Sequence, residues 1–227
     1  MFFKKLSEFS KRSITYITGV IFLLIFHQLN VLPHLINLLF FVLYSEMLIA
    51  TYISKVERWK KILVFIIGFV YLSVGVETLV EVITSGYALQ FLACVFAIDT
   101  IAYFAGKSIQ GPKLMPSVSP KKTVSGFVIA MLFGAMIFEV FFSAVLETNA
   151  FGGFLIGLLF AIIVQAGDLF VSFAKRTLLV KDASNLLPGH GGFWDRADSI
   201  FAGSIFFVII LAYFIPLLSL FKNMNMR

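Results

Sequence analysis

Long apolar stretches alternate with short polar segments along almost the whole chain. Seven of these stretches approach the roughly 20 apolar residues that a helix needs to cross a bilayer. They cover about 13–30, 35–54, 62–82, 87–106, 124–146, 152–174 and 199–221. The stretches are too long and too uniformly apolar for barrel strands, and lipid leaves the edge of an open sheet unpaired. The pattern therefore predicts an all-α fold: a polytopic helical integral membrane protein with about seven transmembrane helices.

The composition agrees with this prediction and excludes several other classes of protein. Of the 227 residues, 60% are hydrophobic and 13% are charged, whereas a soluble domain is roughly 45–50% apolar and about 25% charged. This apolar content excludes intrinsic disorder. A single cysteine, Cys94, excludes a disulfide-stapled secreted domain. We interpret the net charge of +6 as a sign of membrane topology and affinity for anions.

The basic residues follow the predicted spans in alternation. Four lie before the first span, and four lie in each of the segments after the second, fourth and sixth spans. The segments after the first, third and fifth spans contain none. Sixteen of the 18 basic residues are thus predicted on one side of the membrane. Positive residues in short loops favour the cytoplasmic side, so we expect the N-terminus in the cytoplasm.

Five acidic residues lie within the predicted spans: Glu46, Glu77, Asp99, Glu139 and Asp168. An ionised carboxylate near the bilayer centre costs about 2.5–3.5 kcal/mol on insertion scales, so each is a candidate for function. For the three glutamates we expect side chains that snorkel to the surface or pair with another helix. Glu46, Asp99 and Asp168 all lie in the cytoplasmic half of their spans, but the two aspartates are the functional candidates because of their polar neighbours.

One helical face of the sixth span is polar. Gln165, Asp168, Ser172 and Lys175 follow the i, i+3, i+4 spacing that places side chains on a single face. Such a face would be unfavourable against lipid. It is therefore predicted to line a protein-enclosed site that opens towards the cytoplasm.

Two predicted cytoplasmic loops, 106–123 and 175–198, combine basic, small and acidic residues. Glycines let backbone amides approach phosphate oxygens, and lysine and arginine supply charged donors. Aspartates supply the oxygen ligands that magnesium prefers. Attraction to lipid headgroups would account for the basic residues but not for the aspartates and the glycine-rich run. The loops therefore predict a site for a metal-chelated, phosphate-bearing substrate at the membrane surface.

The second loop resembles a known family. Residues 172–198 read SFAKRTLLVKDASNLLPGHGGFWDRAD, which closely resembles the signature of the bacterial phosphatidate cytidylyltransferases, also called CDP-diacylglycerol synthases. Three shorter elements are also similar: QAGD at 165–168, DTIAYFAG at 99–106 and SPKKT at 119–123. The resemblance covers about residues 95–200. In a departure from the family pattern, Ser125 stands where a glutamate is usual.

The resemblance implies magnesium-dependent transfer of CMP from CTP to phosphatidic acid, giving CDP-diacylglycerol and pyrophosphate in phospholipid biosynthesis. It implies catalytic roles for Asp168, Asp195, Asp198, Lys175 and Arg176, and metal binding by Asp168, Asp195 and Asp198. The substrate-binding residues that it implies are Ser172, Lys181, His190, Gly191, Gly192, Arg196, Lys121, Lys122, Thr123 and Asp99.

The expected partners are CTP, phosphatidic acid and membrane lipids, with no nucleic acid. A homodimer and a monovalent cation beside the magnesium stay open. The expected location is the bacterial inner membrane, crossed several times, with the active site facing the cytoplasm. Residues 1–90 are expected to anchor the protein and form a lipid-side scaffold, and residues 91–227 to form the catalytic region.

Three other functions are compatible with parts of the pattern. A CTP-dependent kinase of polyprenols or other lipid alcohols would share the phosphate chemistry but would need a general base to activate a neutral hydroxyl. An ion-coupled transporter would account for the intramembrane carboxylates, although nothing resembles paired inverted halves. A non-enzymatic membrane scaffold would not need the aspartates.

Overall fold

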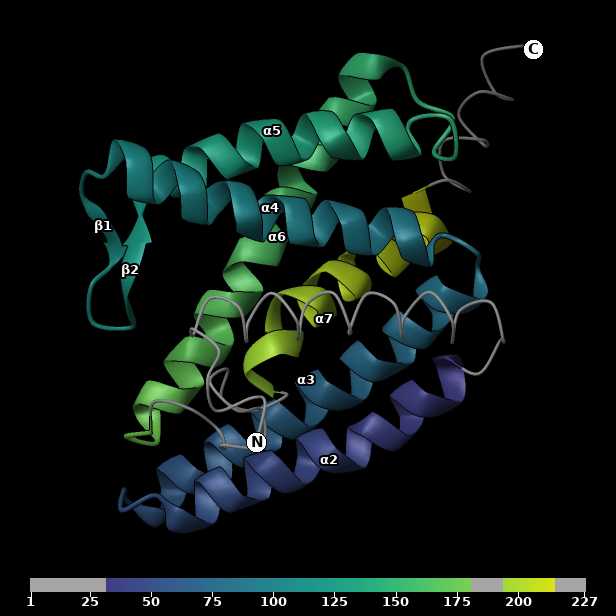
Figure 1. The fold of residues 1–227 in the computed structure, drawn as a ribbon. Helices are drawn as coiled ribbons and strands as arrows, with labels where there is room; N and C mark the ends of the chain where they lie inside the picture. The colour runs from purple at the N-terminus through teal and green to yellow at the C-terminus, as the bar shows by residue number, and fades with distance from the viewer. Residues whose placement is uncertain (1–31, 181–193, 215–227) are drawn as a thin grey trace, which may run out of the picture.

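The computed structural model describes residues 32–180 and 194–214, which form a helical bundle with one small β-hairpin (Figure 1). The elements, in chain order, are α2 (Leu32–Ile53), α3 (Arg58–Thr84), α4 (Ala88–Ile109), β1 (Lys113–Met115), β2 (Ser119–Thr123), α5 (Val124–Phe142), α6 (Ala150–Thr177), α7 (Trp194–Ile209) and a terminal π-helical turn η2 (Ile210–Phe214). Six of the seven predicted spans therefore correspond to helices. The first, 13–30, lies outside the described residues.

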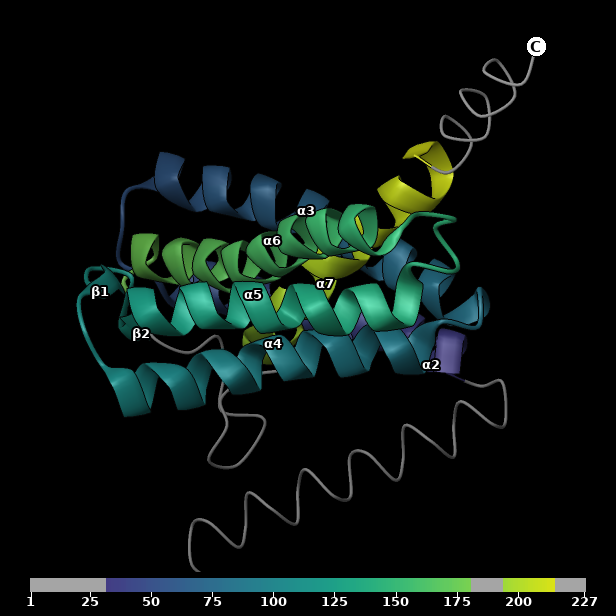
Figure 2. The ribbon, with the colours of Figure 1, turned by 90° about the horizontal axis from the view of Figure 1, so that it is seen from above.

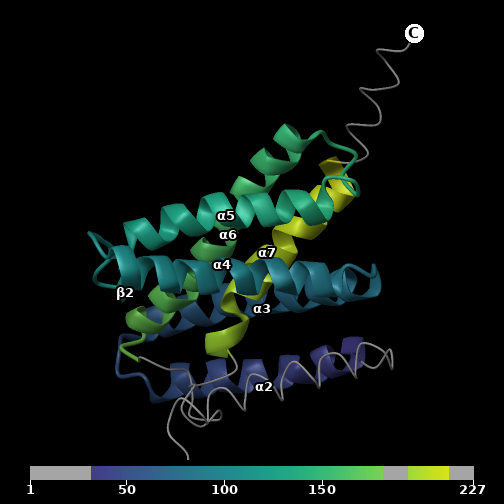
Figure 3. The ribbon, with the colours of Figure 1, turned by 45° about the horizontal axis from the view of Figure 1, so that its top comes forward.

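Consecutive helices pack against each other, except that α3 packs mainly against α2 and α7 and only weakly against α4. Helices α2 to α5 extend roughly along one direction, whereas α7 crosses them obliquely (Figure 3). The hairpin lies at one end of the bundle and η2 at the other (Figure 2). The α2–α3 connection lies at the same end as the hairpin (Figure 1). This arrangement gathers segments that are far apart in the sequence at the hairpin end.

The described helices have the lengths and composition of a multi-pass membrane protein. Four of them, α3, α4, α5 and α6, are long and apolar enough to cross a bilayer. The described apolar stretches of α2 and α7 are shorter, at Leu38–Ile53 and Ala197–Tyr213. Large apolar side chains such as Phe41 and Val140 are exposed on the outer surface, as expected for residues that face lipid. The number of seven spans and the side on which the N-terminus lies stay predictions.

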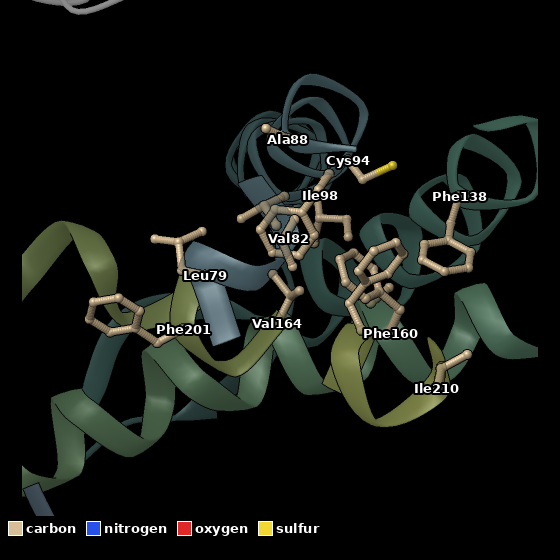
Figure 4. Packing of buried hydrophobic residues seen from close by; sticks show 14 of the residues in the cluster. Leu79, Val82, Ala88, Cys94, Ile98, Phe138, Phe160, Val164, Phe201 and Ile210 are labelled. Carbon is tan, nitrogen blue, oxygen red and sulfur yellow. The ribbon is translucent and has the colours of Figure 1, made fainter. Parts of the chain in front are cut away.

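Phenylalanine rings fill much of the core between α4, α5, α6 and α7 (Figure 4). The centroids of Phe138 and Phe160 are 4.8 Å apart, and those of Phe142 and Phe207 are 4.7 Å apart. Cys94 is fully buried in the same cluster, as expected from its apolar surroundings in the sequence. Small residues bring the helices close together: a Cβ atom on Gly157 of α6 would lie 2.7 Å from the Ala135 carbonyl oxygen of α5. Such close approach is typical of helix packing in membranes.

The first predicted loop, 106–123, contains regular structure. Helix α4 continues to Ile109, and β1 and β2 pair antiparallel, with Lys113 opposite Thr123. Between helix and strand, Gln110 and Gly111 adopt φ angles of 60° and 104°, a left-handed conformation that turns the chain away from the helix axis. The all-α prediction is therefore correct for the spans but omits a two-stranded sheet.

The second predicted loop, 175–198, is helical at both of its ends. Lys175 and Arg176 belong to the last turn of α6, and the first turn of α7 contains Asp195 and Asp198. Basic side chains in a last turn and acidic ones in a first turn both interact favourably with the helix dipole. The apolar pattern ended the spans before these turns, which are polar but still helical.

Candidate active site

Asp168 lies in the half of α6 that we predict to be nearer the cytoplasm, and it has two polar partners. The Lys122 Nζ atom of β2 is 2.5 Å from Asp168 Oδ2. The Ser172 hydroxyl, one helical turn further along α6, donates to Asp168 Oδ1 at 3.3 Å. The side chains of Lys122 and Asp168 are 25% and 30% exposed, so solvent screens their attraction only in part. The structure thus brings together one predicted residue of the first loop and two of α6.

Asp198 is a buried carboxylate that interacts electrostatically with Asp168. It is 6% exposed, and its Oδ1 atom accepts a hydrogen bond of 2.9 Å from the Ser199 backbone N–H. Asp168 and Asp99 act on it electrostatically as like charges, and Lys175 acts as an opposite charge. The Ser199 hydroxyl in turn donates to Asp99 Oδ2 at 2.9 Å. Helices α4, α6 and α7 therefore each contribute one carboxylate to a single cluster.

Lys175 and Arg176 lie side by side in the sequence but have different surroundings. Lys175 is 7% exposed. Arg176 donates from Nε to the Val118 carbonyl at 3.2 Å and from Nη1 to the Val180 carbonyl at 3.0 Å. Since Val118 lies between β1 and β2, the arginine connects the hairpin to the end of α6. Lys175 acts on Asp198 as an opposite charge, which associates it with the carboxylate cluster.

Two hydroxyl groups form hydrogen bonds where β2 ends and α5 begins. Thr123 is the N-cap of α5, and its hydroxyl oxygen accepts from the Gly126 backbone N–H at 3.2 Å. The Ser125 hydroxyl donates to the Gln110 carbonyl, which joins the start of α5 to the end of α4. Lys121, in contrast, is exposed. The structure thus gives Thr123 a capping role that the motif alone did not indicate.

The residues of the predicted polar face of α6 have two different surroundings. Gln165 is 3% exposed, and its amide donates to the backbone carbonyls of Ala161 at 3.2 Å and Phe127 at 3.4 Å. It therefore pairs with backbone in the bundle. Asp168, Ser172 and Lys175, the remaining members of the face, lie at the cluster described above.

Two residues that the sequence did not single out for the site contact the first turn of α7. The Trp194 backbone N–H donates to Glu46 Oε2 of α2 at 2.8 Å. The Tyr71 hydroxyl of α3 donates to the Asp198 carbonyl at 2.6 Å. Glu46 could be noticed in the sequence, because it is an acidic residue within a predicted span, and pairing with another helix was one of the two roles expected for it. Nothing in the sequence pointed to Tyr71, because tyrosines are common in apolar spans.

Some predicted residues cannot be placed with the rest. Lys181, His190, Gly191 and Gly192 lie outside the described residues. Asp195 and Arg196 belong to the first turn of α7, but their side chains lie outside the described part of the chain. Among the side chains that are described, no group of three or more His, Cys, Asp or Glu residues is arranged to hold a metal ion.

Comparison with known proteins agrees with the resemblance in the loops. The chain matches the model of the cytidylyltransferase family over residues 2–214. Several similar proteins are named phosphatidate cytidylyltransferase. The one from Aquifex aeolicus (strain VF5) is 38% identical over 134 residues, which are 59% of this chain and 50% of that protein. The one from Rickettsia bellii (strain RML369-C) is 30% identical over 184 residues, which are 73% of this chain and 80% of that protein.

A third relative, from Bacillus subtilis (strain 168), is 42% identical over 134 residues, or 57% of this chain and 49% of that protein. The chain thus spans only about half the length of the Aquifex and Bacillus relatives. The family model, however, covers nearly all of the chain, including every described helix. This chain is therefore a member of the cytidylyltransferase family.

Proposed function

We propose that this protein is a phosphatidate cytidylyltransferase, which transfers CMP from CTP to phosphatidic acid and releases pyrophosphate. The observation that carries the proposal is the cluster of three carboxylates, Asp99, Asp168 and Asp198, beside Lys122 and Lys175 at one end of a membrane bundle. The relatives named for this reaction support it.

In this reaction a phosphate oxygen of the lipid attacks the α-phosphorus of CTP. The bond from that phosphorus to the oxygen bridging to the β-phosphate breaks, and pyrophosphate leaves with the electron pair. The attacking oxygen is already anionic, so no strong general base is needed. Catalysis then depends on positioning and charge neutralisation. Lys122 pairs with Asp168, and Lys175 acts on Asp198 as an opposite charge; we assign both lysines to the phosphates.

We propose that a magnesium ion binds at these carboxylates. Magnesium is usually held by one or two carboxylates together with waters and substrate phosphates, so a cage of three protein ligands is not required. Asp168 already pairs with the Lys122 ammonium group and acts on Asp198 as a like charge, so a nearby cation would reduce the repulsion between the two carboxylates. We assign the ion to Asp168 and Asp198, with Asp195 of the same α7 turn. The bound ion would neutralise charge on the phosphates.

We propose further that the site faces the cytoplasm of a bacterial cell at the inner membrane. Of the lysines and arginines in the described residues, all but Arg196 belong to segments at the hairpin end of the bundle: Lys55, Arg58, Lys60, Lys61, Lys107, Lys113, Lys121, Lys122, Lys175 and Arg176. The α3–α4 and α5–α6 connections have none. This asymmetry supports the orientation through the positive-inside rule.

The test is an assay of purified protein with phosphatidic acid, magnesium and CTP labelled at the α-phosphate. We expect label to enter the lipid and an equal amount of pyrophosphate to be released, and we expect Asp168→Asn to abolish both. Label that stays in CDP would instead indicate a lipid kinase. No lipid label above the Asp168→Asn control would disprove the proposal.

A further inference from the structure

We infer that Glu46 of α2 and Tyr71 of α3 are positioning residues that hold the aspartate-bearing first turn of α7 in place for the reaction. This inference rests on the function proposed above for Asp195 and Asp198. It assigns to the N-terminal helices a role in the site, in addition to the anchoring and scaffolding expected from the sequence.

The contact of Glu46 is buried and lies at the helix start. Glu46 is fully buried, Trp194 is 1% exposed, and the carboxylate accepts from the backbone N–H of this first residue of α7. The first backbone N–H groups of a helix have no partner within the helix. A carboxylate there satisfies one of them and interacts favourably with the helix dipole. Since the two residues are 148 positions apart, the bond fixes where α7 begins relative to α2.

Tyr71 holds the other end of the same turn. Its hydroxyl donates to the Asp198 carbonyl, and its ring packs against Phe170 of α6 and Phe201 of α7. Gly167 of α6 leaves room for this junction, because a Cβ atom there would lie 2.8 Å from the Asp198 carbonyl oxygen and 3.3 Å from the Tyr71 hydroxyl. The turn from Trp194 to Asp198 is therefore bonded at its first and last residues by side chains from α2 and α3.

Positioning predicts that an acceptor at residue 46 matters more than its charge. Glu46→Gln keeps an oxygen that can accept from the Trp194 N–H, whereas Glu46→Leu removes it. Loss of a buried hydrogen bond leaves an unsatisfied donor. We expect Glu46→Leu to lower kcat by about tenfold or more, with KM for CTP nearly unchanged, and Glu46→Gln to stay within about threefold of the native protein. We expect Tyr71→Phe, which removes only the hydroxyl, to lower kcat about two- to tenfold.

Matched controls separate positioning from general damage. Glu77→Leu makes the same change at an exposed position of α3, and Tyr87→Phe removes a hydroxyl from a tyrosine near the far end of the bundle. Both are expected to keep native kcat. If either control lowers kcat as much as its partner variant, the loss is unspecific and the inference is wrong.

A second measurement needs no turnover. The chain has two tryptophans, so Trp59→Phe leaves Trp194 as the only one. In this background we expect Glu46→Leu to shift Trp194 emission to longer wavelength, as the start of α7 loosens, while Glu46→Gln and Glu77→Leu leave it unchanged. An unshifted emission in Glu46→Leu, or a shift with native kcat, would overturn the inference. If the native protein transfers no CMP, the proposed function fails, yet the emission still tests whether Glu46 holds α7.

Discussion

Lys122 Nζ lies 2.5 Å from Asp168 Oδ2, and this ion pair connects the β-hairpin to the carboxylate cluster. The lysine is in a strand that the sequence showed only as part of a polar loop, and the aspartate is on a membrane-spanning helix. The pair thus places a cation directly at the carboxylate that we assign to the metal.

The ion pair predicts a strong effect of Lys122→Met on catalysis. A hydrogen bond to a charged group contributes about 1.5–3 kcal/mol, so its loss in the transition state would lower kcat/KM for CTP by about 10- to 150-fold. Lys60→Met is the control, because Lys60 also has an acidic partner, Glu57, in an exposed i, i+3 pair. Exposed pairs of this kind contribute little. Steady-state kinetics of the two variants would refute the role of Lys122 if both keep native kcat/KM.

Gly167 predicts a steric effect at the crossing of α6 and α7. A Cβ atom there would overlap the Ala202 side chain and lie 2.8 Å from the Asp198 carbonyl oxygen. Gly167→Ala must therefore push the helices apart, at a cost of about 1–3 kcal/mol for overpacking, and displace Asp198. Gly203→Ala is the matched control on α7, since its nearest neighbour would be the Val164 side chain at 3.1 Å. The unfolding temperature in detergent and the rate of CMP transfer should both be lower in Gly167→Ala than in Gly203→Ala. Equal losses in the two variants would contradict the prediction.

Thr123 offers a test of capping against substrate binding. Thr123→Ala removes the side-chain acceptor for the Gly126 N–H and is expected to reduce the free energy of unfolding by about 1 kcal/mol, whereas Thr123→Ser should keep it. Thr84→Ala is a control, because within the described part of the chain that hydroxyl donates to carbonyls of its own helix, those of Val80 and Glu81. Thermal unfolding of the three variants measures these differences in stability. If the hydroxyl also binds substrate, KM for CTP will rise in Thr123→Ala even at temperatures where the variant is fully folded.

The orientation can be tested with single cysteines. Cys94 is the one cysteine of the chain and is buried, so Cys94→Ala gives a background without thiols. Lys113→Cys lies exposed in the hairpin, and Ser85→Cys lies exposed in the α3–α4 connection at the other end. With a membrane-impermeant maleimide, we expect intact cells to label Ser85→Cys and only opened cells to label Lys113→Cys. The reverse pattern would show that the site faces outwards.

The sequence by itself determined the properties that depend on local composition. Apolar length predicted the helices α2 to α7, because each span must satisfy its own backbone hydrogen bonds in lipid. Charge alternation predicted the end at which the basic residues gather, and the motif around Asp168 indicated the family. The hairpin was not predicted, since its strands are short and polar and depend on the left-handed turn at Gln110 and Gly111.

Only the tertiary structure decided which residues meet. Lys122 and Asp168 are on different elements, and no periodicity relates Glu46 to Trp194 or Tyr71 to Asp198. These contacts depend on the angle and depth at which α7 crosses α3 and α6, which close-packed small residues such as Gly167 permit. Helix formation is governed by neighbours in the sequence, whereas this crossing is governed by packing between distant segments. The chain therefore shows in its sequence that it spans the membrane and resembles cytidylyltransferases, and only its packing shows how α2 and α3 reach the aspartate turn.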